Sequence, residues 1–298
     1  EGWFFTWTPD ELLHALGAEE ADLLSEAFGV SPRGNFEGRN VLHRVKSDRE
    51  LAKRRRASAD AVSKRLAGAR ASLYQARSKR PPPLRDDKII AAWNGLMISA
   101  LAQAGWALAE DRYVDAASRA ARFVLDRMRG PSDRLVRTSR DGVHSGPGFL
   151  EDYAFMVAAC LDLYDTTGDP AWLEAAIALK RDQDEWFSYP DGGYFLTASD
   201  ADDLLVRETP VYDGAGPSGN SVAAANLLRL HDLTAQSEWR TRAERLFASV
   251  SLRLTRAPTG SPLLLAALDR YYDTPLEVAI IASDGERDGL ELARTLRA

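Results

Sequence analysis

Residues 93–124, WNGLMISALAQAGWALAEDRYVDAASRAARFV, have the pattern of a helix, a short turn and a second helix, and the chain repeats this pattern twice more. The second copy is EDYAFMVAACLDLYDTTGDPAWLEAAIALKRDQDEWF (residues 151–187), and the third is GNSVAAANLLRLHDLTAQSEWRTRAERLFASV (residues 219–250). In each copy an aromatic residue opens the second helix and an alanine follows four residues later. The three pairs are Tyr113 and Ala117, Trp172 and Ala176, and Trp239 and Ala243. Internal repetition of this kind predicts an architecture built from helical hairpins.

Long connections separate the hairpins, so each unit exceeds the roughly 34 to 47 residues of common helical solenoid repeats. Such connections have a shared role if the hairpins surround one cavity. We therefore predict an all-α fold that is part of an α/α toroid, as in six-hairpin glycosidases, with an up-down helical bundle as the alternative. The segments DGGYFLT (191–197) and LLVRETP (204–210) predict short β-hairpin strands at the rim.

The first helix of the first hairpin carries an apolar stripe. Apolar residues recur there at the i, i+3, i+4 and i+7 spacing that is typical of an amphipathic helix. They are Trp93, Leu96, Met97, Ala100, Leu101, Ala104 and Leu108. Alanine fills many other positions, so we expect this helix to pack on more than one side. A toroid that lacks some of its hairpins should also expose an apolar edge.

The N-terminal part of the chain has its own helix signals. Thr8 can cap a helix, and the two short helices that follow are expected to end near Gly17 and Gly29. We expect one long polar helix over residues 48–78, ended by the three prolines at 81–83.

These elements predict the domain organisation. The whole chain, 1–298, is expected to be part of one toroid domain. Within it, 1–80 forms an irregular and outer-helix segment, and 81–298 forms three helical hairpin units and a C-terminal tail. Because the chain begins with Glu1 rather than methionine, we also expect it to be a fragment of a longer protein.

Composition excludes several classes of protein. The 38 Lys and Arg residues against 44 Asp and Glu give a net charge of -6, which disfavours nucleic-acid binding, and the basic run Lys53–Arg56 is expected on a solvated face. No apolar run reaches the roughly 20 residues of a membrane-spanning helix. The single cysteine, Cys160, lies in an apolar run and is expected to be a buried thiol. We predict no metal, no cofactor, no nucleic-acid or membrane partner, and a cytoplasmic location.

Polar and aromatic residues gather just before, or in the first turn of, each predicted inner helix. The first group is Asp87, Lys88, Trp93 and Asn94, the second is Asp152 and Tyr153, and the third is Asp213, Ser218 and Asn220. In a toroid these helix starts face the same end of the cavity. Aromatic rings stack on pyranose faces, and two carboxylates across a cleft can serve as acid and base. The three groups therefore predict a carbohydrate site.

An acid at a helix start also has a structural explanation, because it caps free N–H groups and interacts favourably with the helix dipole. Ser218 in particular has the position of an N-cap. Among the histidines, His43 and His144 lie in loop or extended segments from which they could reach a cavity, and neither lies in the first turn of an inner helix. This placement favours hydrolase-like acid/base chemistry over a histidine-based sugar epimerisation, which stays an alternative.

Five ordered motifs carry a resemblance to a known family. They are EGWFFTWTPDEL (1–12), NFEGRNVLH (35–43), RDDKIIAAWNGLMISAL (85–101), LEDYAFMV (150–157) and DGAGPSGNSVAAANLLRL (213–230). The chain resembles the thioredoxin-domain-containing proteins related to spermatogenesis-associated thioredoxin-like protein. The resemblance implies a thioredoxin-like domain that precedes an α/α toroid similar to six-hairpin glycosidases and to N-acylglucosamine 2-epimerases. This chain is similar to the later part of that toroid.

Three functions follow as hypotheses. The first is a carbohydrate-directed enzyme in which Asp152 and Asp213 form the acid/base pair, Asp87 assists, and Trp93 and Tyr153 are sugar platforms. In it Lys88, Asn94, Ser218 and Asn220 bind substrate. The second is a non-catalytic module that binds a glycan or a peptide and works with the thioredoxin-like domain, which this chain lacks. In the third, the motif residues only cap and clamp helices.

Overall fold

The structure is a computed structural model that describes residues 2–130, 132–201 and 204–274, together with Val278, Ile280, Gly289, Leu292 and Thr295. The chain divides into two compact units, Glu1–Asp86 and Asp87–Ala298, and the boundary falls just after the three prolines. Whether both units belong to one toroid domain stays a prediction.

The first unit is helical. Its helices are α1 (Gly2–Phe5), α2 (Pro9–Leu16), α3 (Ala18–Phe28), α4 (Asp48–Arg55) and α5 (Ala59–Ser78). Leu12, Leu23, Leu24, Leu51 and Leu66 are among the buried residues of its core. The two predicted helix ends are confirmed, since α2 ends at Gly17 and α3 at Gly29.

The single long helix predicted over residues 48–78 is wrong, because two helices occupy that range. Helix α4 ends where Arg56 adopts a left-handed conformation with φ of 51°. The Ser58 hydroxyl then accepts the N–H of Ala61 at 3.1 Å and caps α5. A favourable N-cap inside a polar stretch thus starts a new helix where helical periodicity alone predicts continuity.

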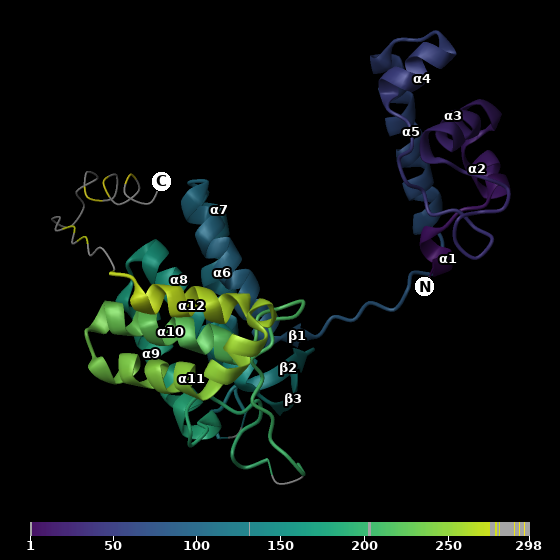
Figure 1. The fold of residues 1–298 in the computed structure, drawn as a ribbon. Coiled ribbons are helices and arrows are strands. Elements are labelled where there is room, and N and C mark those ends of the chain that lie inside the picture. Colours follow the sequence, from purple (N-terminus) through teal and green to yellow (C-terminus); the bar gives the residue numbers. More distant parts are fainter. Residues whose placement is uncertain are drawn as a thin grey trace. The chain divides into compact units, whose positions relative to one another are not determined.

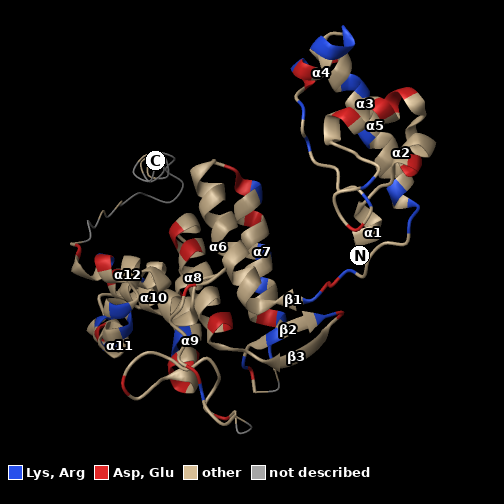
Figure 2. Ribbon diagram, turned by 45° about the vertical axis from the view of Figure 1, so that its right-hand side comes forward, with Lys and Arg blue, Asp and Glu red and all other residues tan. Residues whose placement is uncertain are grey.

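The basic run Lys53–Arg56 lies at the end of α4, beside acidic residues of α3 (Figure 2). Arg54 and Arg55 lie 3.1 and 2.9 Å from the Glu26 carboxylate, and Arg55 lies 2.7 Å from Asp22. Much of the positive charge of the run is therefore neutralised within the first unit.

The second unit consists mainly of paired helices. These are α6 (Ala91–Ala107) with α7 (Asp111–Arg127), α8 (Leu150–Thr167) with α9 (Pro170–Phe187), and α10 (Gly219–Thr234) with α11 (Ser237–Arg256), followed by α12 (Pro262–Tyr272). Helix α8 packs against α6 and α10, and α10 packs against α12, while α7, α9 and α11 pack on their own partners (Figure 1). This two-layer array of hairpins is part of an α/α toroid, as predicted. The predicted C-terminal tail beyond α12 lies almost entirely outside the described residues.

The repeated aromatic and alanine residues lie where the layers meet. Trp172 and Trp239 are 5% and 1% exposed, and the alanines four residues after the aromatics are fully buried. Close approach of the inner helices depends on small residues. A Cβ added at Gly95 of α6 would lie 2.8 Å from the carbonyl carbon of Phe155 in α8.

The largest members of the apolar stripe on α6 lie on its exposed side. Trp93 and Met97 are 68% and 59% exposed, whereas α6 buries a face of smaller residues that includes Ala91, Gly95 and Ile98. The spacing of apolar residues does not distinguish a face of large side chains from a face of glycine and alanine that lets two backbones approach. As a result α6 presents an exposed apolar surface.

A small antiparallel sheet lies next to the start of α6. Strands β1 (Ile89–Ile90), β2 (Val136–Arg140) and β3 (Val143–Pro147) lie in that order, with Thr138 opposite Ser145. Asp141 and Gly142 join β2 to β3 with φ of 51° and 78°, the positive values that a type I′ turn requires.

The rim strands predicted at 191–197 and 204–210 are not formed. Residues 204–210 contain no strand, and the first segment contributes a single bridge between Ser188 and Tyr194. The rim hairpin lies instead at β2 and β3, where an Asp-Gly turn fits the twist of two strands. Along the described residues, no helix combines the length and hydropathy that crossing a membrane requires.

Candidate functional site

Asp152, in the first turn of α8, is fully buried and links two inner helices. Its Oδ1 accepts the N–H of Ala92 in the first turn of α6, and its Oδ2 accepts the N–H of Phe149, both at 2.8 Å. Arg137 Nη1 lies 3.3 Å from Oδ2. Burial raises the pKa of the Asp152 carboxyl, while the Phe149 hydrogen bond and the Arg137 charge oppose that change. The carboxylate is therefore a cap shared by α6 and α8.

Asp213 links the segment before α10 to the start of α12 in the same manner. Its Oδ1 accepts the N–H of Ser218 at 2.8 Å, and its Oδ2 accepts the N–H of Leu263 at 2.9 Å. The Ser218 hydroxyl in turn accepts the N–H of Ser221 at 3.1 Å, which confirms Ser218 as the N-cap of α10.

Asn220 is 1% exposed and clamps two connecting segments to α10. Its Oδ1 accepts the N–H of Tyr194 at 2.9 Å. Its Nδ2 donates to the carbonyl oxygens of Tyr194 at 2.9 Å and of Pro210 at 2.8 Å. The Asn220 side-chain amide thus supplies the hydrogen bonds that a neighbouring strand would otherwise make to these connecting segments.

Tyr153 lies within the core of the second unit. It is 1% exposed, its Oη accepts the N–H of Leu135 at 3.1 Å, and its ring centroid lies 5.2 Å from that of Phe187. Burial raises the pKa of its phenol. A ring in this position packs against protein on both sides, which does not suit a sugar platform.

The first predicted group is the most accessible. Trp93 and Lys88 are exposed, and Asn94 is partly buried, with its Nδ2 donating to the Ile90 carbonyl at 2.9 Å. Asp87 Oδ1 lies 2.7 Å from Arg140 Nε on β2.

The helix starts are therefore joined in pairs. Asp152 connects α8 to α6, and Asp213 connects the segment before α10 to α12. Within the described part of the chain, the carboxylate partners differ: Asp87 pairs with Arg140, Asp152 bonds to Ala92 and Phe149, and Asp213 bonds to Ser218 and Leu263. Their roles as a catalytic set stay a prediction.

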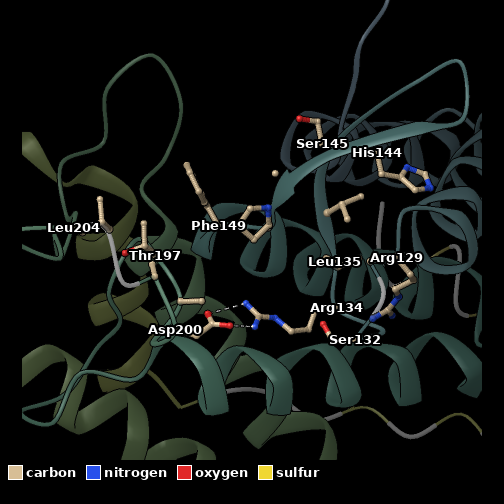
Figure 3. Close-up of a pocket in the computed structure, with 17 residues that line it drawn as sticks. Arg129, Ser132, Arg134, Leu135, His144, Ser145, Phe149, Thr197, Asp200 and Leu204 are labelled. Atoms are coloured by element: carbon tan, nitrogen blue, oxygen red, sulfur yellow. Dashed lines mark hydrogen bonds and ion pairs between the residues drawn. The ribbon is translucent and has the colours of Figure 1, made fainter.

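A cavity of about 950 Å³ opens beside β2 and β3 (Figure 3). We call it the hairpin pocket. Its lining residues are 129–130, 132, 134–136, 144–149, 197–198, 200–201 and 204. None of the predicted site residues lines it. Two of their hydrogen-bond partners do, however, because Phe149 donates to Asp152 and Leu135 donates to Tyr153.

Arg134 and Asp200 form an ion pair in the hairpin pocket (Figure 3). Arg134 Nη1 and Nη2 lie 2.6 and 3.3 Å from the two Asp200 carboxylate oxygens. The Arg134 guanidinium also stacks over the Trp186 ring at 4.1 Å. The hydrogen bond between Arg134 and Asp200 lowers the pKa of the carboxyl and raises the pKa of the guanidinium, so both groups are charged.

Sequence reasoning missed Arg134, Phe149 and Asp200. The Asp-Gly turn at 141–142, with extended residues on both sides, is a hairpin signal that could have located β2 and β3. Of the two histidines expected near a cavity, His144 lines the hairpin pocket, and His43 lies in the first unit, 3.3 Å from Asn35.

No group of three or more His, Cys, Asp or Glu residues in the described segments is arranged to hold a metal ion. Cys160 is fully buried, and burial raises the pKa of its thiol to about 12. The thiolate needed for nucleophilic attack is therefore scarce at neutral pH.

Comparison with known proteins gave relatives of the whole chain and likenesses of its fold. No family model matches the chain. It is 36% identical to human spermatogenesis-associated protein 20, in an alignment that covers 100% of this chain and 42% of that protein.

Two solved structures are similar to part of the chain at low sequence identity. Cellobiose 2-epimerase of Spirochaeta thermophila has a TM-score of 0.44 and 18% identity, and covers 55% of this chain and 43% of its own. A family 105 glycoside hydrolase of C. acetobutylicum has a TM-score of 0.46 and 11% identity, and covers 83% of this chain and 70% of its own. Along its whole length, the chain is a homologue of spermatogenesis-associated protein 20, of which it spans 42%.

Proposed function

We propose that the second unit binds a carbohydrate in the hairpin pocket. The observation that carries this proposal is a cavity of about 950 Å³ whose lining holds both the Phe149 ring and the charged pair Arg134 and Asp200 (Figure 3). Small-molecule sites of roughly 300 to 1,000 Å³ combine an apolar lining with a few polar groups. A sugar ring suits such a lining, because it presents C–H groups to an aromatic face and hydroxyls to charged groups.

Binding without turnover fits the predicted acids best. Both carboxylate oxygens of Asp152 and of Asp213 accept backbone N–H groups at helix starts. A proton-transfer role for either acid would compete with these caps. These bonds favour the third hypothesis, in which the motif residues cap and clamp helices, for Asp152, Asp213, Ser218 and Asn220. Ligand binding is then a role of the hairpin pocket.

A glycan array followed by calorimetric titration of each hit tests the proposal. Replacing Phe149 by leucine keeps an apolar side chain but removes the ring, so the affinity for the hit should fall about tenfold. Phe123→Leu on α7 is the matched control, since Phe123 is 38% exposed and lies outside the hairpin pocket. Absence of any glycan hit, or equal affinities for the two variants, would show that the pocket does not bind sugar.

Glycoside hydrolysis is a second candidate function, with Asp152 and Asp213 as acid and base and Asp87 as a further catalytic carboxylate. Burial raises the pKa of Asp152, which is the direction of change that a general acid needs. Product analysis of every array hit separates the two functions. Hydrolysis would give shorter sugars that Asp152→Asn no longer releases, and 2-epimerisation would give an isomer of unchanged mass. Unchanged sugar leaves binding alone.

We infer from the family resemblance that a thioredoxin-like domain precedes this unit in the longer protein, and we propose separately that the protein is cytoplasmic. The site would then act on, or hold, a glycan or peptide presented next to a redox domain. Sequencing the upstream coding region tests the first inference, and imaging of the tagged full-length protein tests the second.

A further inference from the structure

We propose that the hairpin pocket selects a sugar that carries a carboxylate, with Arg134 as the group that binds it and Asp200 as the internal carboxylate that the ligand displaces. This inference rests on the proposed carbohydrate binding and names its ligand class. It concerns residues outside the helix-start groups that the sequence pointed to.

The Arg134 side chain is held in a geometry that fits a carboxylate. It is 16% exposed, its guanidinium stacks over the Trp186 ring at 4.1 Å, and both Nη atoms face the Asp200 carboxylate, at 2.6 and 3.3 Å. Two parallel donors in one plane match the two oxygens of a carboxylate, and contact with the Trp186 ring limits the movement of the guanidinium. A neutral hydroxyl would satisfy only one of the two donors.

Asp200 is the partner that can move. Its side chain is 56% exposed, whereas Arg134 is mostly buried and is fixed by stacking. A mostly buried guanidinium without an anion is costly, so Asp200 keeps it paired. A carboxylate on the ligand can replace Asp200 at little cost, because one ion pair is exchanged for another and the freed Asp200 returns to water. A neutral sugar has no group to offer in this exchange.

The remaining charges of the pocket favour an anion once Asp200 has moved. Its described lining carries two guanidinium groups, Arg129 and Arg134, and one carboxylate, Asp200. Arg129 is 22% exposed and donates through Nε and Nη1 to the carbonyl oxygens of Leu125 and Asp133. The nearest carboxylate to Arg129 Nη1, that of Asp182, lies 4.0 Å away. Among the described lining residues, displacement of Asp200 therefore leaves two guanidinium groups and no carboxylate, with Asp182 outside the lining beside Arg129.

Calorimetric titration with a panel of trisaccharides tests this inference. The panel pairs uronate-containing and sialylated sugars with their methyl esters, which keep the shape and remove the charge. At least one acid should bind about tenfold more tightly than its ester. Asp200→Asn should raise the affinity for that acid severalfold and leave the affinity for the ester unchanged. Glu244→Gln is the control, because Glu244 lies on α11 outside the hairpin pocket and should change neither affinity.

Arg134→Lys keeps the positive charge but removes the planar pair of donors. It should lower the affinity for the acid about tenfold while the ester binds as before, which separates recognition by the guanidinium from a general effect of charge. If every acid binds no better than its ester, or if Asp200→Asn weakens the acid, the inference is overturned while sugar binding in the pocket stands. If no sugar of either kind binds, the proposed function fails as well.

Discussion

Lys180 provides a test of the packing between the two helical layers. It lies on α9, is fully buried, and its Nζ donates to Asp184 and to the Tyr194 Oη, the latter at 2.7 Å. Its ammonium also lies 5.7 Å from the centroid of the Trp239 ring on α11. Burial lowers the pKa of Lys180 from 10.5 to about 8, and the charge of Asp184 opposes that change only in part.

The lowered pKa predicts that the folded protein becomes more stable as the pH rises. Between pH 8 and 10.5 the unfolded chain keeps a proton that folded Lys180 has released, so raising the pH favours the folded state. At 1.36 kcal/mol per pKa unit, the free energy of unfolding should gain about 2 kcal/mol between about pH 7 and pH 9.5. Burial raises the pKa of Tyr194 well above 10, so its opposing effect begins only above that pH.

Urea unfolding of the wild type and of Lys180→Met across this pH range measures the gain. Subtracting the free energy of unfolding of Lys180→Met from that of the wild type cancels the titration of groups that the two proteins share. This difference should increase as the pH rises. Lys64→Met is the matched control, because Lys64 is exposed on α5, and its difference from the wild type should not depend on pH. A difference for Lys180 that is flat, or that shrinks as the pH rises, would refute the reasoning.

Two further predictions concern the contacts between inner helices. Gly95→Ala should lower the free energy of unfolding by about 2 kcal/mol, because the new Cβ would lie 2.8 Å from the Phe155 carbonyl carbon. Gly68 is exposed on α5, and a Cβ there would have nothing within 4 Å, so Gly68→Ala should raise the free energy of unfolding by up to about 1 kcal/mol. Thermal unfolding of both variants checks the opposite signs, and a stabilised Gly95→Ala would contradict the close approach of α6 and α8. Asp152→Ala should lower the free energy of unfolding by about 3 kcal/mol, since it removes the acceptor of the buried Ala92 N–H and of the partly buried Phe149 N–H. Glu151→Ala at the neighbouring, partly exposed position should change the free energy of unfolding by less than about 1 kcal/mol. Equal losses in urea unfolding would show that the Asp152 carboxylate does not cap both helices.

The helical hairpins could be predicted because their signal is local and repeated. Trp172 and Ala176 lie one helical turn apart, and both are buried between the two helical layers. Each hairpin makes this contact between layers, so the four-residue spacing is repeated in each hairpin. The N-cap at Ser218 is equally local, since its hydroxyl bonds to a residue three positions later. Such features depend on a few neighbouring residues, and the sequence shows them directly.

The hairpin pocket could not be predicted because it depends on residues far apart in the chain. Arg134 and Asp200 are 66 positions apart, and no spacing rule connects them. An acid at a helix start is expected both for a helix cap and for a catalytic group, so the sequence does not separate the two roles. The hydrogen bonds of Asp152 to Ala92 and Phe149 show that both of its carboxylate oxygens act as caps. The buried face of α6 could not be predicted from local spacing for a related reason, since Gly95 lies against the backbone of another helix.

A crystal structure of the chain with the tightest-binding glycan from the array tests the central claim most directly. We expect the sugar to lie in the hairpin pocket against Phe149, with an acidic group on the Arg134 guanidinium and Asp200 turned away from it. A sugar bound instead over the exposed Trp93, next to Asp152, with the hairpin pocket unchanged, would contradict the account and return the site to the helix starts.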